Sequence, residues 1–264
     1  MSENATARDH LKRIFTENFS VADVAEPLVS FDAATGVADV RQLMDERGYE
    51  VVGVREQGLV TGYVNKEELD DGACGDAMRR FEEGEVLAES VCLPTLVGLL
   101  NTAPRVFVTS LGRVGGIATR SDLLKPPVRM WLFGMITIIE MGLARAIEGR
   151  FPDEGWKALL SAGRLEKAET LLAERKRRNQ ELDLLDCLQF SDKGLITLKD
   201  ETLRGQIGYA SRNRGEQAIK GLEALRNNLA HAQDIIACDF DTIVRLTENL
   251  DKVFAIRPGT NVPD

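Results

Sequence analysis

One short run of the sequence places a glycine, a hydroxyl and a carboxylate at a spacing suited to nucleotide binding. The run is Gly116-Ile-Ala-Thr-Arg-Ser-Asp-Leu-Leu, in which Asp122 follows Thr119 by three residues. If a strand ends and a helix begins here, Thr119 is the N-cap and Asp122 lies in the first helical turn. A helix N-terminus favours phosphate, and a carboxylate can accept hydrogen bonds from ribose hydroxyls. The same Thr-x-x-Asp spacing also forms a capping box without any ligand, and that alternative stays open.

A second group of residues near the C-terminus could act on RNA. In Leu225-Arg-Asn-Asn-Leu-Ala-His, an imidazole could accept a proton from a ribose 2′-hydroxyl while a guanidinium stabilises the charged phosphate. On one helix, Asn227 and His231 lie about 40° apart, whereas Arg226 and His231 lie about 140° apart. A second copy of the helix is therefore needed to bring Arg226 and His231 together. The alternative is that His231 is a solvent-facing helix residue.

The elements that would position the first group occur twice between residues 20 and 125. Each copy has a helical stretch, an apolar strand, a polar turn, a second strand and the start of another helix. A period of roughly 50 to 60 residues with this order indicates an internal repeat of supersecondary units. Since each copy is too small to bury its own sheet face, we expect the two copies to pack together.

The first copy departs from the second at the chemically important positions. Its equivalent run is Gly62-Tyr-Val-Asn-Lys-Glu-Glu, with Asn65 at the threonine position and Glu68 at the aspartate position. Both residues are tolerable for the same chemistry, although the glutamate side chain is one methylene longer. The sequence therefore leaves open whether this copy holds a second site, and substitutions of Asn65 and Glu68 are expected to matter less than substitution of Asp122.

The double repeat and the Gly116–Asp122 run resemble those of CBS domains. The resemblance covers residues 20–125 and implies a tandem pair, or Bateman module, with an α/β (α+β) fold. It also implies that Thr119 faces the phosphate and Asp122 the ribose of an adenine nucleotide such as AMP, ADP or ATP. Gly116, Asn65 and Glu68 are the further nucleotide-binding candidates, and no other cofactor and no metal is expected.

After Pro126-Pro127 the strand pattern stops and the sequence predicts a helical bundle. The Pro pair cannot continue a helix and so indicates a boundary. Residues 190–198 contain Asp192-Lys-Gly and are predicted to be a loop or a short extended piece. The last predicted helix holds Leu222, Leu229 and Ile236 on one apolar stripe. Helices are predicted at about 128–149, 153–162, 164–189, 200–209 and 214–236.

The Arg226-Asn227…His231 pattern on this last helix resembles the Arg-x4-His motif of HEPN domains. These are small helical bundles that often dimerise, and many are metal-independent endoribonucleases while others are binding modules. The resemblance implies a homodimer in which Arg226, Asn227 and His231 form a catalytic cleft, with RNA as a partner. The domains expected are an N-terminal arm (1–20), the repeats (21–126, as about 21–72 and 86–125) and a HEPN-like domain (127–264).

Two functions are consistent with these patterns, and the sequence leaves open whether the protein is an enzyme. The first is a regulatory protein in which the CBS pair senses an adenine nucleotide and controls a helical effector or dimerisation domain. The second is a nucleotide-gated endoribonuclease. Fold resemblance alone does not decide between them.

Composition limits the remaining possibilities. The formal net charge is −9, and residues 1–128 hold 13 Lys and Arg against 21 Asp and Glu. This acidic half argues against broad electrostatic capture of nucleic acid by that half. The four cysteines lack zinc-site spacing, which favours a reducing compartment. The N-terminus lacks a signal-peptide core. Residues 131–144 are apolar but shorter than the ~20 residues of a spanning helix, so we expect a buried core helix and a cytoplasmic protein without a membrane partner.

Overall fold

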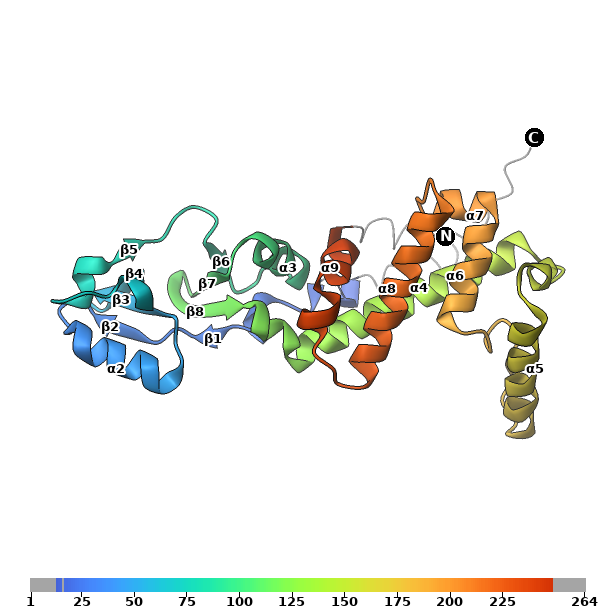
Figure 1. Cartoon of the computed structure of the whole chain (residues 1–264), viewed down its shortest axis with the longest axis horizontal. Coiled ribbons are helices and arrows are strands. Elements are labelled where there is room, and N and C mark those ends of the chain that lie inside the picture. The colour runs from blue at the N-terminus through green and yellow to red at the C-terminus, as the bar shows by residue number, and fades with distance from the viewer. Residues whose placement is uncertain (1–12, 16, 249–264) are drawn as a thin grey trace. The chain divides into compact units, whose positions relative to one another are not determined.

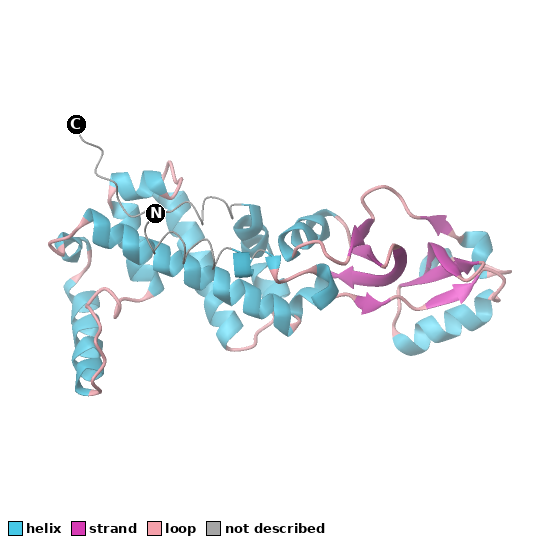
Figure 2. Cartoon of the chain, turned by 180° about the vertical axis from the view of Figure 1, so that it is seen from behind, coloured by secondary structure: helices cyan, strands magenta, loops and turns pink. Residues whose placement is uncertain are grey.

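The computed structural model describes residues 13–15 and 17–248, so most of the predicted N-terminal arm lies outside the described residues. The chain divides into two compact units, Thr16–Val128 and Arg129–Asp264 together with Met1–Phe15. Within the described residues every strand belongs to the first unit, and the second unit is helical (Figures 1 and 2). The predicted fold class, mixed α and β followed by all-α, is confirmed.

The N-terminal unit contains two four-stranded sheets of identical design. One has the strand order β2-β3-β4-β5 and the other β1-β8-β7-β6. In each sheet a parallel pair is followed by two antiparallel pairs. The elements in chain order are η1 (Val21–Asp23), β1 (Glu26–Pro27), β2 (Ser30–Asp32), α2 (Val37–Arg47), β3 (Val51–Glu56), β4 (Leu59–Asn65), η2 (Lys66–Glu68), η3 (Cys74–Ala77), β5 (Arg79–Arg80), β6 (Val86–Ala88), α3 (Leu93–Thr102), β7 (Arg105–Ser110), β8 (Arg113–Thr119) and η4 (Arg120–Leu124).

The two sheets repeat one another down to their pairing register. Val51 pairs with Asn65, and 54 residues later Arg105 pairs with Thr119. Both hairpins also carry a register shift at the same place, after Val54 in one and after Val108 in the other. A bulge re-aims the strand that contains it, so the two hairpins present their ends in equivalent positions. The predicted internal repeat is confirmed.

Each sheet is completed by a short strand that precedes the other repeat in the chain. β1 precedes the first repeat but pairs with β8 of the second, with Glu26 opposite Ile117. β5 precedes the second repeat but pairs with β4 of the first, with Arg79 opposite Tyr63. Because the outer strands are exchanged, neither repeat has a complete sheet by itself. The two repeats therefore form one folding unit.

An aromatic cluster joins the two repeats. The rings of Tyr63 from the first repeat and Phe107 from the second have centroids 4.7 Å apart, and Phe81 lies 4.8 Å from Phe107. Leu28 is buried in the same cluster. Aromatic pairs of this geometry contribute about 0.5–1.5 kcal/mol beyond the area they bury. Since the cluster needs rings from both repeats, it stabilises their association.

The second unit is built from helices of unequal length. In chain order these are α4 (Pro126–Arg150), η5 (Gly155–Leu159), α5 (Ala162–Arg177), α6 (Phe190–Lys199), α7 (Glu201–Gln206), α8 (Arg212–Ala230) and α9 (Ile235–Glu248). α6 packs against α8, and α8 packs against α9. A core that includes Ile147, Trp156, Leu185, Leu188 and Ile196 lies between α4, η5, α6 and the segment before α6.

The prediction of a loop at residues 190–198 is wrong, because these residues form α6. Asp192 does not open a turn; its carboxylate accepts a hydrogen bond from the Gln189 backbone N–H at 3.2 Å and caps the helix. Lys193 is buried and pairs with Glu140 at 2.8 Å. A Cβ on Gly194 would lie 2.6 Å from the Ile219 side chain. The Asp-Lys-Gly residues therefore cap α6 and join it to α4 and α8.

Four predicted helices end earlier than expected. The second, predicted to continue to residue 162, is the 3-10 helix η5, which ends at Leu159, and the fourth, predicted to continue to residue 209, is α7, which ends at Gln206. The third was predicted to continue to residue 189, but α5 ends at Arg177 and Asn179 has a left-handed φ of 57°. The fifth was predicted to continue to residue 236, but α8 ends at Ala230 and Ala232 has φ 53°. A new helix, α9, follows, and the Asp234 carboxylate caps it by accepting from Ile236 N at 2.9 Å. The expected single stripe through Leu222, Leu229 and Ile236 is therefore divided between two helices.

The apolar run at residues 131–144 belongs to a longer helix than the sequence indicates. α4 has 25 residues and begins at Pro126, since proline is tolerated in a first helical turn. Among the described residues it is long and apolar enough to cross a membrane by length and composition, and 44% of its most apolar stretch is buried inside the structure. Trp131 is fully buried, whereas Phe133 is 45% exposed. The absence of a membrane partner stays a prediction.

Candidate functional site

Thr119 and Asp122 lie at the junction of β8 and η4, where the sequence places them. Thr119 is the N-cap of η4. One oxygen of the Asp122 carboxylate, Oδ2, accepts hydrogen bonds from the Thr119 backbone N–H at 2.7 Å and from its hydroxyl at 2.8 Å. Asp122 is 7% exposed. The two residues thus form the capping box that the sequence left open as an alternative.

The second carboxylate oxygen of Asp122 faces a lysine. Lys125 Nζ lies 2.9 Å from Asp122 Oδ1 and also pairs with Glu26, which belongs to β1. Burial lowers the pKa of Lys125, but hydrogen bonds to Glu26 and Asp122 outweigh burial and raise it above its usual value. Asp122 is thus held by three donor groups from two residues. A ribose that binds Asp122 must replace at least one of them.

The equivalent junction of the first repeat holds a different set of partners. Asn65 is the N-cap of η2, and its amide donates to Glu68 Oε2 at 2.8 Å. Arg79 of β5 pairs with Glu68, and Arg105 of β7 donates to the Asn65 side-chain oxygen. Partial burial acts to raise the pKa of Glu68, but hydrogen bonds from Asn65 and Arg79 lower it by more, so the net shift is downward. The Arg105 guanidinium also lies over the Tyr63 ring, 5.4 Å from its centroid.

The repeat symmetry shows that the two junctions differ in charge. Arg79 and Glu26 occupy equivalent places, since they pair with the equivalent residues Tyr63 and Ile117. Arg105, in turn, has Val51 as its equivalent. We call the first group, Asn65, Glu68, Arg79 and Arg105, the cationic junction. We call the second group, Thr119, Asp122, Lys125 and Glu26, the acidic junction.

Sequence reasoning missed four of these residues. Glu26, Arg79 and Arg105 are distant in sequence from their partners, which are Lys125, Glu68 and Asn65 respectively, and Lys125 was not singled out. The exchange of β1 and β5 is what brings Glu26 and Arg79 to the junctions. One signal could have found Arg105. It begins the first strand of a predicted hairpin, and Thr119 ends the second strand, so the two residues are expected to face each other. No such local signal marks Glu26 or Arg79.

Gly116 has a packing role in the structure. It lies opposite Pro27 of β1, and a Cβ there would lie 3.2 Å from Val108 Cβ and 3.4 Å from the Glu26 carbonyl oxygen. The equivalent Gly62 is tighter, with a Cβ position only 2.2 Å from the Arg79 carbonyl oxygen. These glycines let the exchanged outer strands approach the hairpins. They thereby position Glu26 and Arg79.

The C-terminal candidates lie at the end of α8. His231 is the C-cap residue and is exposed, Asn227 is exposed and Arg226 is half-buried. Among the described residues, no hydrogen bond or ion pair joins the side chains of these three. The neighbouring Asn228 instead ties α8 to α9, because its amide donates to the buried Asp239 carboxylate at 2.8 Å. One chain therefore does not assemble Arg226 and His231 into a site.

No group of three or more potential ligands among residues 13–15 and 17–248 could hold a metal ion. The two junctions offer hydrogen-bonding and charged groups. A carboxylate beside an N-cap can bind the hydroxyls and phosphate of a nucleotide. The cationic junction adds two guanidinium groups, which suit phosphate oxygens.

No family model and no curated protein matches this chain. Solved structures that are similar to it include CBSX2 in complex with AMP, at 21% identity and a TM-score of 0.38, covering 42% of this chain and 98% of that chain. The CBS-pair protein CBSX2 from Arabidopsis thaliana is 20% identical with a TM-score of 0.38, covering 42% and 96%. The CBS domain of a bacterial CNNM/CorC family Mg²⁺ transporter in complex with ATP is 15% identical with a TM-score of 0.36, covering 47% and 96%. Likenesses at this level do not identify a ligand for this chain.

Proposed function

We propose that residues 21–126 act as a CBS-type pair that binds an adenine nucleotide, AMP, ADP or ATP, and regulates the helical unit. The observation that supports this is the equivalence of the two junctions. Each hairpin ends in an N-cap side chain followed three residues later by a carboxylate, Asn65 with Glu68 and Thr119 with Asp122. These are groups that can bind phosphate and ribose together. The two groups lie at equivalent ends of the two hairpins, as the shared pairing register shows.

Binding at the acidic junction is an exchange of partners. The Asp122 carboxylate accepts hydrogen bonds from the ribose hydroxyls in place of Lys125, and the released ammonium group can pair with a phosphate oxygen. At the cationic junction Arg79 and Arg105 provide the positive charge directly. We therefore expect the cationic junction to favour ATP over AMP. At the acidic junction, which includes Glu26, we expect the affinity to depend less on the number of phosphates in the nucleotide.

Isothermal titration calorimetry with AMP, ADP, ATP and adenosine tests the proposal. At least one of them should bind the wild type with micromolar affinity, and Asp122→Ala should lower the affinity of one site at least tenfold. The matched control is Asp23→Ala. Asp23 also accepts a hydrogen bond from an N-cap, Ser20, at 2.7 Å, but it belongs to neither junction. If adenine compounds fail to bind the wild type at millimolar concentration, the sensing function is wrong.

For the helical unit we propose a HEPN-like effector that works as a homodimer in the cytoplasm. Its long amphipathic α8 carries the Arg226, Asn227 and His231 pattern at the C-terminal end. In a two-fold pair, the exposed His231 of one copy can meet Arg226 of the other. Light scattering across micromolar concentrations should therefore show a dimer, and a strict monomer would rule out a shared site.

A second candidate function, metal-independent cleavage of RNA, is favoured by the exposure of His231 and Asn227 on a helix end without side-chain partners among the described residues. Purified protein is incubated with single-stranded RNA in EDTA, with and without each nucleotide. Cleavage that leaves a 2′,3′-cyclic phosphate and disappears in both His231→Ala and Arg226→Ala supports the enzyme. Mixing the two inactive variants should restore activity if the site is shared. If the RNA stays intact under every condition, cleavage is ruled out and the regulatory function is the remaining proposal.

A further inference from the structure

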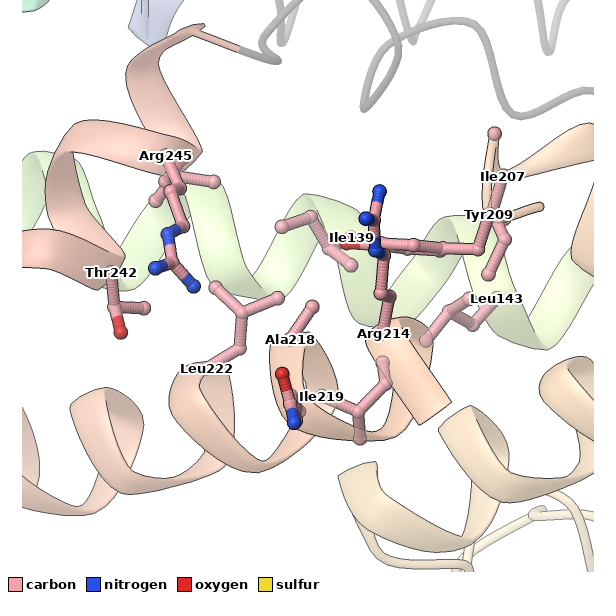
Figure 3. A pocket seen from close by; sticks show the side chains of 13 residues that line it. Ile139, Leu143, Ile207, Tyr209, Arg214, Ala218, Ile219, Leu222, Thr242 and Arg245 are labelled. Carbon is pink, nitrogen blue, oxygen red and sulfur yellow. The ribbon is translucent and has the colours of Figure 1, made fainter. Parts of the chain in front are cut away.

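The helical unit has a partly open cavity of about 460 Å³ that neither the nucleotide site nor the Arg226–His231 pattern uses. Its walls come from α4, α8, α9 and the residues that follow α7 (Figure 3). A volume of this size lies within the usual range for small-molecule sites. All of the described residues that line the cavity belong to one unit.

The walls of the cavity are largely apolar. Ile139 and Leu143 lie four residues apart on α4 and so share one helix face, and both are buried. Leu222 of α8 and Leu246 of α9 face the same space. Along α8 the lining extends from Arg214 to Leu222, which corresponds to about 12 Å of helix. The space is therefore long enough for an extended apolar chain.

Two guanidinium groups border this apolar space. Arg214 lies to one side of Ala218 and Leu222, and Arg245 lies to the other (Figure 3). No Asp or Glu is among the described residues that line the cavity. Two cations beside an apolar cavity without a lining acid attract an organic anion rather than a neutral or cationic ligand.

Arg214 is the better candidate to hold the anionic group. Within residues 13–15 and 17–248 its guanidinium has no hydrogen-bond or ion-pair partner, whereas Arg245 interacts with another group. Arg214 also lies in the first turn of α8, where the helix dipole disfavours a cation. Helix stability therefore does not explain its presence there. The neighbouring Tyr209 is a neutral phenol, since burial raises its pKa and the positive charge of Arg245 offsets this only in part.

We propose that this cavity binds an amphipathic carboxylate with a medium-length alkyl chain. The carboxylate accepts hydrogen bonds from Arg214 and the Tyr209 hydroxyl. The alkyl chain follows α8 toward Leu222 and Leu246 and packs against Ile139 and Leu143 of α4. Such a ligand provides an anionic partner for Arg214 and buries apolar walls that water would otherwise contact.

Binding of decanoate to the full chain tests the proposal by isothermal titration calorimetry, with decanol as the charge control. Decanoate should bind with micromolar affinity, and decanol at least tenfold more weakly. Arg214→Gln should weaken decanoate at least tenfold without changing decanol. The matched control is Arg212→Gln, on the same helix turn, because Arg212 pairs with Glu216 at 2.8 Å and does not line the cavity.

A second variant tests the location independently of charge. Ala218→Phe places a ring in the middle of the cavity and should abolish binding of both compounds, with circular dichroism confirming that the helices remain. Displacement of the apolar anion anilinonaphthalene sulfonate by decanoate gives a second readout. Equal binding of decanoate and decanol, equal losses in Arg212→Gln and Arg214→Gln, or no binding by the wild type would overturn the proposal.

Discussion

At the scale of single residues, Asp122 is a buried carboxylate of the N-terminal unit with both of its oxygens engaged. Its two oxygens serve the Thr119 cap and the Lys125 ammonium, although the residue is almost fully buried. A nucleotide that takes over this carboxylate exchanges existing hydrogen bonds for new ones. The binding affinity of the nucleotide therefore reflects only the difference in free energy between the old and the new hydrogen bonds.

Replacing Asp122 by Ala should also destabilise the ligand-free protein. The change removes the N-cap partner of Thr119 and leaves Lys125 with Glu26 and the Val24 carbonyl oxygen. Loss of such a cap costs about 1 kcal/mol. Urea unfolding followed by circular dichroism should show a lower midpoint with an unchanged slope. Asp23→Ala should lower stability by a similar amount while leaving nucleotide binding intact. An Asp122→Ala protein as stable as wild type would contradict the capping-box geometry.

The lowered pKa of Glu68 predicts a pH dependence of stability. A carboxyl group whose pKa is lower in the folded state contributes stability above its unfolded pKa, near the ordinary value of 4.5, and loses it as the pH falls through the folded value. Glu68→Gln should therefore flatten the loss of stability below about pH 4.5. The control is Glu67→Gln, at the exposed neighbouring position. Identical acid profiles for wild type and Glu68→Gln would contradict the Arg79 and Asn65 contacts.

At the scale of elements, the close approach of α6 and α8 depends on glycine. Cβ atoms on Gly194 and Gly215 would lie 2.6 Å from Ile219 and 2.2 Å from Leu198, respectively. Each glycine thus makes room for an apolar side chain of the facing helix. The helix that sequence reasoning missed, α6, is held by this packing although its Asp-Lys-Gly run is typical of turns.

Gly194→Ala should destabilise the helical unit by about 1–3 kcal/mol, because an added methyl forces Ile219 out of its position. The same substitution at Gly163, in α5, meets no atom within 4 Å and should be neutral or slightly stabilising, since alanine favours helix. Thermal unfolding of both variants measures the difference. Equal effects at the two positions would show that α6 and α8 are not closely packed.

At the scale of the whole molecule, each unit contains one buried thiol that can report on its stability. Cys74 lies in the N-terminal unit and Cys187 in the helical unit, and both are buried. Burial raises the pKa of both thiols, which further lowers their reactivity. Cys238 is exposed and Cys92 partly so. A thiol reagent should therefore modify Cys74 and Cys187 slowly and Cys238 fast.

A saturating adenine nucleotide should slow the modification of Cys74 by a thiol reagent. Ligand at one hundred times its Kd reduces the unfolded population about a hundredfold, or about 2.7 kcal/mol. Mass spectrometry of the labelled peptides measures both thiols in one experiment, with Asp122→Ala as the control. Slowing of Cys187 as well would show that the nucleotide stabilises the helical unit, as regulation requires. An unchanged rate at Cys74 would contradict nucleotide binding by this unit.

Local patterns in the sequence were sufficient for the repeat, the strand order within each hairpin and the Thr119–Asp122 cap. These features depend on residues that are close in the chain, where alternation and capping spacing determine the structure. Because the two hairpins use the same pattern, the equivalence of Asn65 with Thr119 and of Glu68 with Asp122 was also visible.

Tertiary structure alone placed Arg79 beside Glu68 and Glu26 beside Lys125. Glu26 and Arg79 reach the junctions because β1 and β5 pair with the hairpin of the other repeat, and no local pattern specifies such a long-range exchange. Likewise α6 is a helix because Gly194 accommodates Ile219 of α8, a contact between distant segments that overrides a turn-like sequence. The end of α8 at Ala230 is decided by the Asp234 cap of α9 and by Asn228 bonding Asp239. Local spacing therefore determined the elements, and packing between distant segments determined the chemical surroundings of the site.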